Sequence, residues 1–181
     1  MLRNIFFYGT IAGVIVAIPT FGLTVLLKDH APENYGLLIG YSTMLVALSA
    51  IFVAIKRQRD VEGGGVIRFW PALLLGLGVS VIAGILYSLS WEAAMAVTGM
   101  DFAGDYSRQL IEAEKAKGVS GAALAKFTAE MEDFKRNYAN PLYRLPMTFT
   151  EIFPIGVLVS LVSAALLRNS RFLPARAAAG Q

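Results

Sequence analysis

The sequence predicts an all-α, polytopic membrane protein. It would have four transmembrane helices in a single membrane domain, residues 1–181, and an extracytoplasmic helical hairpin between the third and fourth helices. Composition is the first indication, because 56% of the residues are hydrophobic and 16% are charged, whereas a soluble domain carries about 25% charged residues. The pattern of apolar residues along the chain is the second indication. The apolar residues gather in four blocks, each close to the ~20 residues that a helix needs to cross a bilayer, at 5–27, 36–55, 69–90 and 148–167.

The first two apolar blocks predict transmembrane helices. Block 5–27 follows Arg3, as in a signal peptide, but it is longer than the roughly 7–15 apolar residues of such a peptide. No small-residue cleavage site follows it, so we expect a retained helix. Block 36–55 carries no charge, and small residues recur along it at steps of three and four, a spacing typical of close helix contact, at Gly40, Thr43, Ala47, Ala50 and Ala54.

The third block, 69–90, follows a basic, glycine-containing segment at 56–68 that is expected to be a flexible loop. Trp70 and Pro71 open the block, and proline is tolerated in a first helical turn. Beyond them small residues recur every four positions, and the stripe ends in a carboxylate, Glu92. We interpret this stripe, and small residues of the fourth block, as candidate helix-packing positions: Gly76, Ser80, Gly84, Ser88, Gly156 and Ser160.

The polar segment 101–140 predicts the helical hairpin. Gly118 is placed to end its first helix and Ser120 to cap its second. The hairpin either packs on itself or lies on the bilayer, and Pro141 and Pro146 are expected to stop it. Apolar residues of the second helix step by three and four, which predicts one apolar face, at Leu124, Phe127, Met131, Phe134 and Tyr138.

Basic residues near the ends of the blocks set the predicted orientation. The basic residues at the N-terminus, in segment 56–68 and after the last block are as many as Lys28 and the hairpin bases together. Bases in short loops, however, weigh most in setting the orientation. We therefore expect both termini in the cytoplasm and the hairpin outside. The tail, residues 172–181, is expected to be mobile. Because the bases flank apolar blocks, they indicate orientation in a membrane rather than binding to nucleic acid.

Residue types exclude several kinds of site. The chain has no cysteine, which rules out disulfides and thiolate sites, and its one histidine, His30, rules out a multi-histidine metal site. No nucleophile–base pair is placed in the apolar blocks. We expect no cofactor and no enzymatic activity. The expected surroundings are the lipid bilayer, with a second copy or another membrane protein as a partner.

Two acids near the outer ends of adjacent helices, Glu92 and Glu151, form a candidate polar site together with Asn140 and Arg144. Carboxylates inside a membrane are costly and point to function. Two of them close together would share a proton near neutral pH, as a proton-coupled carrier requires. Arg144 and Arg108 are the expected counter-charges.

A structural interpretation competes with this one. Thr148 to Glu151 has the pattern of a capping box, in which the threonine hydroxyl and the glutamate carboxylate bind backbone donors at the start of the fourth helix. Glu92 would then lie in water beside Trp91. The sequence leaves both interpretations open.

The end of the chain carries a recognisable combination of residues between 140 and 168. It consists of Asn140-Pro141, Arg144, Thr148-Phe149, Glu151-Ile-Phe-Pro154, Gly156 and Ser160 to Ala164. This combination, and the order of four apolar blocks with a charged segment before the last, resembles the DUF4199 domain family of bacteria. The resemblance implies a four-helix protein of the bacterial inner membrane, and it supplies neither an activity nor site residues.

Two functions follow as hypotheses. The first is a non-enzymatic structural, accessory or interaction protein that acts through helix packing and the outer hairpin. The alternative is a small proton- or ion-coupled transporter that uses Glu92 and Glu151.

Overall fold

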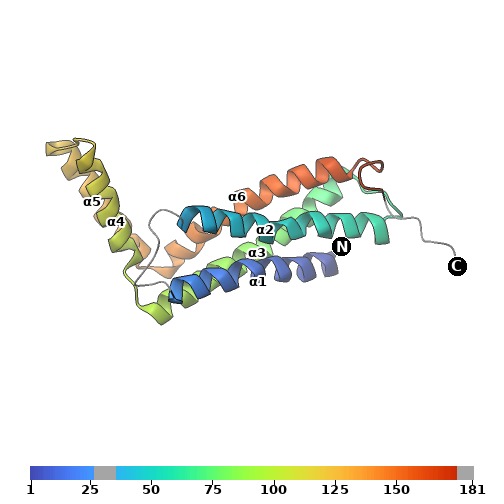
Figure 1. Ribbon diagram of the computed structural model, residues 1–181, viewed down its shortest axis with the longest axis horizontal. Coiled ribbons are helices and arrows are strands. Elements are labelled where there is room, and N and C mark those ends of the chain that lie inside the picture. Colours follow the sequence, from blue (N-terminus) through green and yellow to red (C-terminus); the bar gives the residue numbers. More distant parts are fainter. Residues whose placement is uncertain (27–35, 175–181) are drawn as a thin grey trace.

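The structure is a computed structural model that describes residues 1–26 and 36–174 of the chain (Figure 1). These residues form helices and no strand. The predictions for Lys28, His30 and residues 175–181 lie outside the described residues. In chain order, the elements are α1 (Leu2–Leu26), α2 (Gly36–Arg57), the π-helical turn η1 (Gln58–Glu62), α3 (Phe69–Thr98), α4 (Phe102–Ala116), α5 (Gly121–Tyr138) and α6 (Pro141–Leu167).

Four of these helices, α1, α2 together with η1, α3 and α6, are long and apolar enough to cross a membrane. This finding confirms the predicted all-α fold with four membrane-length helices. Helix α3 is the centre of the bundle: it contacts α1, α2 and α6, and its apolar stretch is the most buried of the four. Leu75, Val79 and Ala83 along α3 are fully buried.

Figure 1 shows the four long helices side by side, with α4 and α5 projecting steeply from one end. We call this the hairpin end. The N-terminus lies at the opposite end, where the Met1 amino group contacts Glu62 of η1. Helices α4 and α5 pack against each other, with Gly118 between them at φ 87°. Ser120 is the N-cap of α5, although its side chain makes no capping hydrogen bond.

The interface between α3 and α6 is built from reciprocal glycine–serine contacts. A Cβ added at Gly76 would lie 2.7 Å from the Ser160 hydroxyl oxygen, and one at Gly156 would lie 2.5 Å from the Ser80 hydroxyl oxygen. Ser80 donates to the Gly76 carbonyl at 2.9 Å, and Ser160 donates to the Gly156 carbonyl at 2.6 Å. Each hydroxyl is therefore satisfied within its own helix, and the glycines allow the two backbones to approach closely.

The other two residues of the α3 stripe, Gly84 and Ser88, continue this face toward the hairpin end. A Cβ at Gly84 would lie 2.6 Å from the ring of Phe149 on α6. Ser88 is buried and donates to the Gly84 carbonyl at 2.9 Å. The stripe thus lies against α6, and Glu92 follows it by one turn.

Helix α6 begins at Pro141 rather than at residue 148, which makes two of the predictions wrong. Asn140 caps the helix, because its side-chain oxygen accepts the Leu142 N–H at 3.0 Å. Pro146 does not stop the hairpin but lies inside α6. The proposed capping box, Thr148 to Glu151, is also inside the helix, and a capping box requires the free donors of a first turn.

The segment 56–68 is not a flexible basic loop. Helix α2 continues through Arg57 into η1, and residues 63–68 alone connect η1 to α3. Helix α3 also extends beyond residue 90, to Thr98, and ends where Gly99 adopts φ 62° and donates to the Met95 carbonyl at 3.0 Å. Glu92 therefore lies within a helix.

Candidate functional site

Glu92 is neutralised by Arg144 where α3, α5 and α6 meet. The Nε and Nη2 groups of Arg144 donate to the two carboxylate oxygens of Glu92, each at 2.5 Å. Its Nη1 group donates to the Tyr138 carbonyl at 3.1 Å. Such bidentate, charge-assisted contacts are among the strong polar interactions of proteins, and this one joins α3 to α6, while the contact with the Tyr138 carbonyl ties the end of α5 to α6. The other expected counter-charge, Arg108, pairs with Asp105 within α4 instead.

Glu151 has a different partner. Its Oε2 atom accepts a hydrogen bond from the Tyr87 hydroxyl of α3 at 2.8 Å. Within residues 1–26 and 36–174, Glu151 takes part in none of the ion pairs. Glu92 and Glu151 therefore bind separate groups, and the structure does not join them as the predicted proton-sharing pair.

A cavity of about 350 Å³ lies at the hairpin end, and Glu151 is part of its wall. Helices α2, α3, α4, α5 and α6 all contribute to this wall. Glu92 and Arg144 are not among its lining residues. Of the eleven lining residues that lie within 36–174, seven are aromatic, namely Tyr41, Tyr87, Trp91, Phe102, Tyr106, Phe134 and Tyr138, and the others are Gly40, Met44, Met147 and Glu151.

The aromatic rings of the cavity form a connected cluster between the bundle and the hairpin. The Trp91 ring lies edge-on to Phe102, with centroids 5.1 Å apart, and Phe102 stacks on Tyr106 at 5.9 Å. Trp91 also donates from Nε1 to the Tyr138 hydroxyl at 2.8 Å. Burial raises the pKa of Tyr138 to about 12, so that hydroxyl stays neutral at physiological pH. The cluster joins α3, α4 and α5 through ring contacts and one hydrogen bond.

The comparison with known families agrees with this architecture. The sequence matches the family described as "Protein of unknown function (DUF4199)" over residues 7–169. The chain belongs to the DUF4199 family. This match takes in most of α1 and all of α2, α3, α4, α5 and α6, and it confirms the family resemblance noted at residues 140–168. No curated protein and no solved structure matches the chain.

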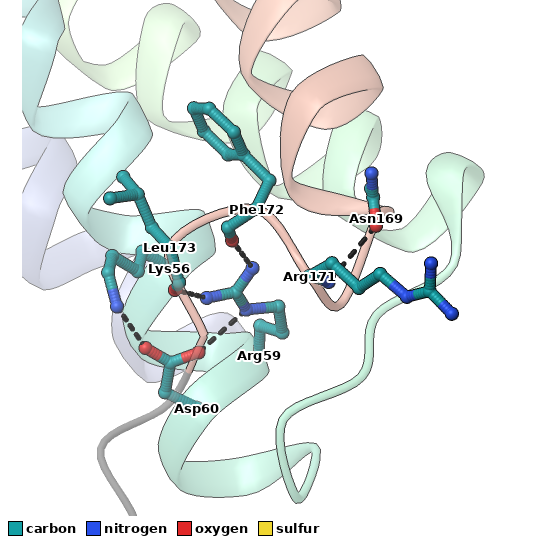
Figure 2. A network of polar contacts seen from close by, with 7 residues as sticks. All are labelled: Lys56, Arg59, Asp60, Asn169, Arg171, Phe172 and Leu173. Carbon is teal, nitrogen blue, oxygen red and sulfur yellow. Dashed lines mark hydrogen bonds and ion pairs between the residues drawn. The ribbon is translucent and has the colours of Figure 1, made fainter.

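The DUF4199 protein contains a second polar cluster, which sequence reasoning missed, at the end of the bundle opposite the hairpin (Figure 2). Its centre is Arg59 of η1, which is 0% exposed. Arg59 donates to the Phe172 carbonyl at 2.8 Å, to the Leu173 carbonyl at 2.5 Å and to the Asp60 carboxylate at 2.6 Å. Asp60 also accepts from Lys56. One buried guanidinium thus fastens the segment after α6 to the α2–η1 helix.

This cluster bears on the expectations for the basic residues and the tail. Arg59 does not lie in solvent as one of several loop charges, because it is buried and hydrogen-bonded. In the tail, predicted to be mobile over residues 172–181, the carbonyls of Phe172 and Leu173 accept hydrogen bonds from Arg59. The two carbonyls that Arg59 binds belong to residues 113 and 114 positions away in the chain, so no local pattern could have identified this role of Arg59.

A metal site finds no support in the part of the chain that the structure describes. No three histidine, cysteine, aspartate or glutamate side chains converge there. Of the two acids predicted for the candidate site, Glu92 is paired with Arg144 and Glu151 faces a cavity.

Proposed function

We propose that this DUF4199 protein is a non-enzymatic protein of the bacterial inner membrane that acts through contacts of its α4–α5 hairpin. The partner is a second copy or another membrane protein, and both termini lie in the cytoplasm. The observation that carries the proposal is the bracing of a projecting hairpin against the bundle (Figure 1). A hairpin that served only as a connection would not require these contacts.

The bracing supports a role in recognition because it fixes the direction in which the hairpin points. Two contacts hold the end of α5: Trp91 donates to the Tyr138 hydroxyl, and Arg144, which is itself fixed by Glu92, donates to the Tyr138 carbonyl. The Glu92 and Arg144 side chains are 19% and 12% exposed, so water competes weakly for this pair. A binding surface held in one orientation loses less entropy when a partner binds.

The charges of the hairpin support a protein partner rather than an anionic lipid surface. Helices α4 and α5 and the turn between them, residues 102–138, carry six acidic and six basic side chains. Several of them pair along the helices, including Glu112 with Lys115 and Glu114 with Lys117, at 2.9 and 2.6 Å. A segment that binds anionic lipids usually has an excess of basic residues, and this hairpin has none.

Site-specific photocrosslinking in the native membrane tests the proposal. Benzoylphenylalanine at Lys126, an exposed position of α5, is expected to give one adduct of defined mass, and the same probe at Leu158 of α6 serves as the control. An adduct of twice the 19.5 kDa chain identifies a second copy. Arg144→Met is expected to lower the yield at position 126, because the hairpin loses its brace. A strict monomer without an adduct at position 126 contradicts the proposal.

A second candidate function is proton- or ion-coupled transport, and one observation favours it: Glu151 lines a cavity. The transport hypothesis that uses Glu92 as a second proton-carrying group has less support, because Glu92 is paired with Arg144. Proton flux in proteoliposomes, followed with a pH-sensitive dye, tests this candidate. Glu151→Gln is expected to abolish such a flux, while the exposed Glu130→Gln leaves it unchanged. Absence of flux through the wild-type protein removes the candidate.

A further inference from the structure

The cavity at the hairpin end combines aromatic walls with one acidic group. Tyr87 and Trp91 come from α3, and Phe102 and Tyr138 come from the hairpin. Among the lining residues that lie within 36–174, Glu151 is the one acid, and none is Lys, Arg or His. Glu151 keeps exposed surface, so a ligand in the cavity can reach it. The volume of about 350 Å³ is within the range of about 300–1,000 Å³ that small-molecule sites occupy.

The protein already places one cation over a ring at this site. The guanidinium carbon of Arg144 lies 5.5 Å from the centroid of the Tyr138 ring, within the distance at which the negative face of a ring attracts a cation. The Arg144 guanidinium is paired with the Glu92 carboxylate, with 2.5 Å between Nη2 and Oε2. Glu151, in contrast, receives one hydrogen bond, from Tyr87, and no ion pair from the described residues. Among the described lining residues, the Glu151 carboxyl is therefore an acidic group without a counter-charge, set among ring faces.

We propose that this cavity binds an organic ammonium group, with Glu151 as its counter-ion and the surrounding rings, led by Trp91, as its cation–π walls. An anion is repelled by Glu151. Inorganic cations such as Ca²⁺ or Mg²⁺ require several oxygen ligands, and the wall offers one carboxylate. A methylated or alkylated ammonium is large and weakly hydrated, and recognition of such groups is a known use of aromatic cages.

The position of the cavity admits two sources of this chemistry. It lies where the long helices meet the hairpin, since α3 and α6 supply Trp91 and Glu151 while α4 and α5 supply Phe102 and Tyr138. The ends of spanning helices are the level of the lipid head groups, where tryptophan and tyrosine gather. The ammonium group therefore belongs either to a phospholipid head group or to a soluble amine that arrives from the aqueous side.

Fluorescence of Trp91 provides a direct test in the full-length protein. The chain has two tryptophans, and Trp70 lies in the first turn of α3, so Trp70→Phe leaves Trp91 as the reporter. The protein is placed in nanodiscs of phosphatidylglycerol, which has no amine, and titrated with choline. We expect a saturable change in Trp91 emission. The matched probe is 3,3-dimethylbutan-1-ol, which has the shape of choline without its charge, and it is expected to give no saturable change.

Two substitutions separate the contribution of the Glu151 charge to choline binding from that of the aromatic rings. Glu151→Gln keeps the size of the side chain and an oxygen for the Tyr87 hydroxyl, and it is expected to weaken choline binding by about tenfold or more. Phe102→Leu keeps apolar volume but removes a ring face, and a weakening of about threefold or more is expected. Glu112→Gln removes an exposed hairpin charge and is expected to stay within about twofold of the wild type, because solvent screens it. Thermal unfolding of each variant verifies folding.

The choline titrations distinguish the two sources of the ammonium group, and one result would overturn the proposal. In nanodiscs that contain phosphatidylethanolamine, a weaker apparent affinity for choline identifies the lipid head group as the occupant, since it competes for the cavity. An unchanged affinity identifies a soluble ammonium compound. The proposal is overturned if choline and its neutral analogue act alike on the wild-type protein, a result that does not depend on any substitution at Glu151. The result is also independent of the crosslinking test of the hairpin.

Discussion

Replacing Arg59 with methionine is expected to lower the free energy of unfolding by about 3–5 kcal/mol, the range observed when one partner of a buried ion pair is removed. The guanidinium is fully buried and satisfies the Phe172 and Leu173 carbonyls as well as Asp60. Methionine fills similar space but donates to none of them. Two carbonyls and part of a carboxylate would then lack partners at the end of the bundle (Figure 2).

The measurement is denaturant unfolding in mild detergent, with Arg57→Met as the matched control. Arg57 is an exposed residue two positions earlier in the same helix, so its replacement is expected to change stability by about 0.5 kcal/mol or less. Arg59→Lys should fall between the two, because one ammonium cannot reproduce a planar fork of donors. Hydrogen exchange of residues 168–174 should rise in the Arg59 variants alone. Equal stability of Arg59→Met and Arg57→Met would refute the role assigned to the cluster.

Gly156→Ala is expected to destabilise the protein although alanine is the better helix former. The new Cβ would lie 2.5 Å from the Ser80 hydroxyl oxygen and 2.7 Å from the Ser80 Cβ, so α3 and α6 must move apart. Overpacking of this kind costs about 1–3 kcal/mol. Gly22→Ala in α1 is the control, because no heavy atom lies within 4 Å of its added Cβ, and it is expected to stabilise the protein by up to about 1 kcal/mol.

A double-mutant cycle identifies the contact responsible. Ser80→Gly removes the side chain that the new methyl group would meet, so Gly156→Ala combined with Ser80→Gly should recover part of the stability lost by Gly156→Ala. The coupling energy expected for residues in contact is about 0.5–3 kcal/mol, and thermal unfolding in the same detergent measures it. A stabilising effect of Gly156→Ala equal to that of Gly22→Ala would contradict the close approach of the two helices.

Features with a local or periodic signal could be predicted from the sequence. The four apolar blocks became four membrane-length helices because a run of apolar residues in a bilayer must satisfy its backbone internally. Gly118 separates α4 from α5 at a positive φ, which glycine adopts without strain. The stripe from Gly76 to Ser88 lies against α6, as its spacing of four indicates.

Features that depend on tertiary contacts could not be predicted. Pro146 suggested an interruption, yet α6 continues through it, and Arg144 two residues earlier is anchored to Glu92 of α3. The capping-box pattern at Glu151 satisfied a local rule, but its carboxylate binds Tyr87, which is 64 positions away. The aromatic cavity likewise collects side chains from five helices. Each of these outcomes is decided by residues that the local pattern does not contain.

The Arg59 cluster also has a consequence for how the polypeptide is made. Phe172 and Leu173 follow every long helix in the chain, so they leave the ribosome after α6. Until then the Arg59 guanidinium has no carbonyl to bind and must remain hydrated at the membrane surface. Completion of this end of the bundle is therefore a late step of biogenesis, and a chain that stops before residue 172 leaves Arg59 paired with Asp60 but without the two carbonyls that complete its hydrogen bonding.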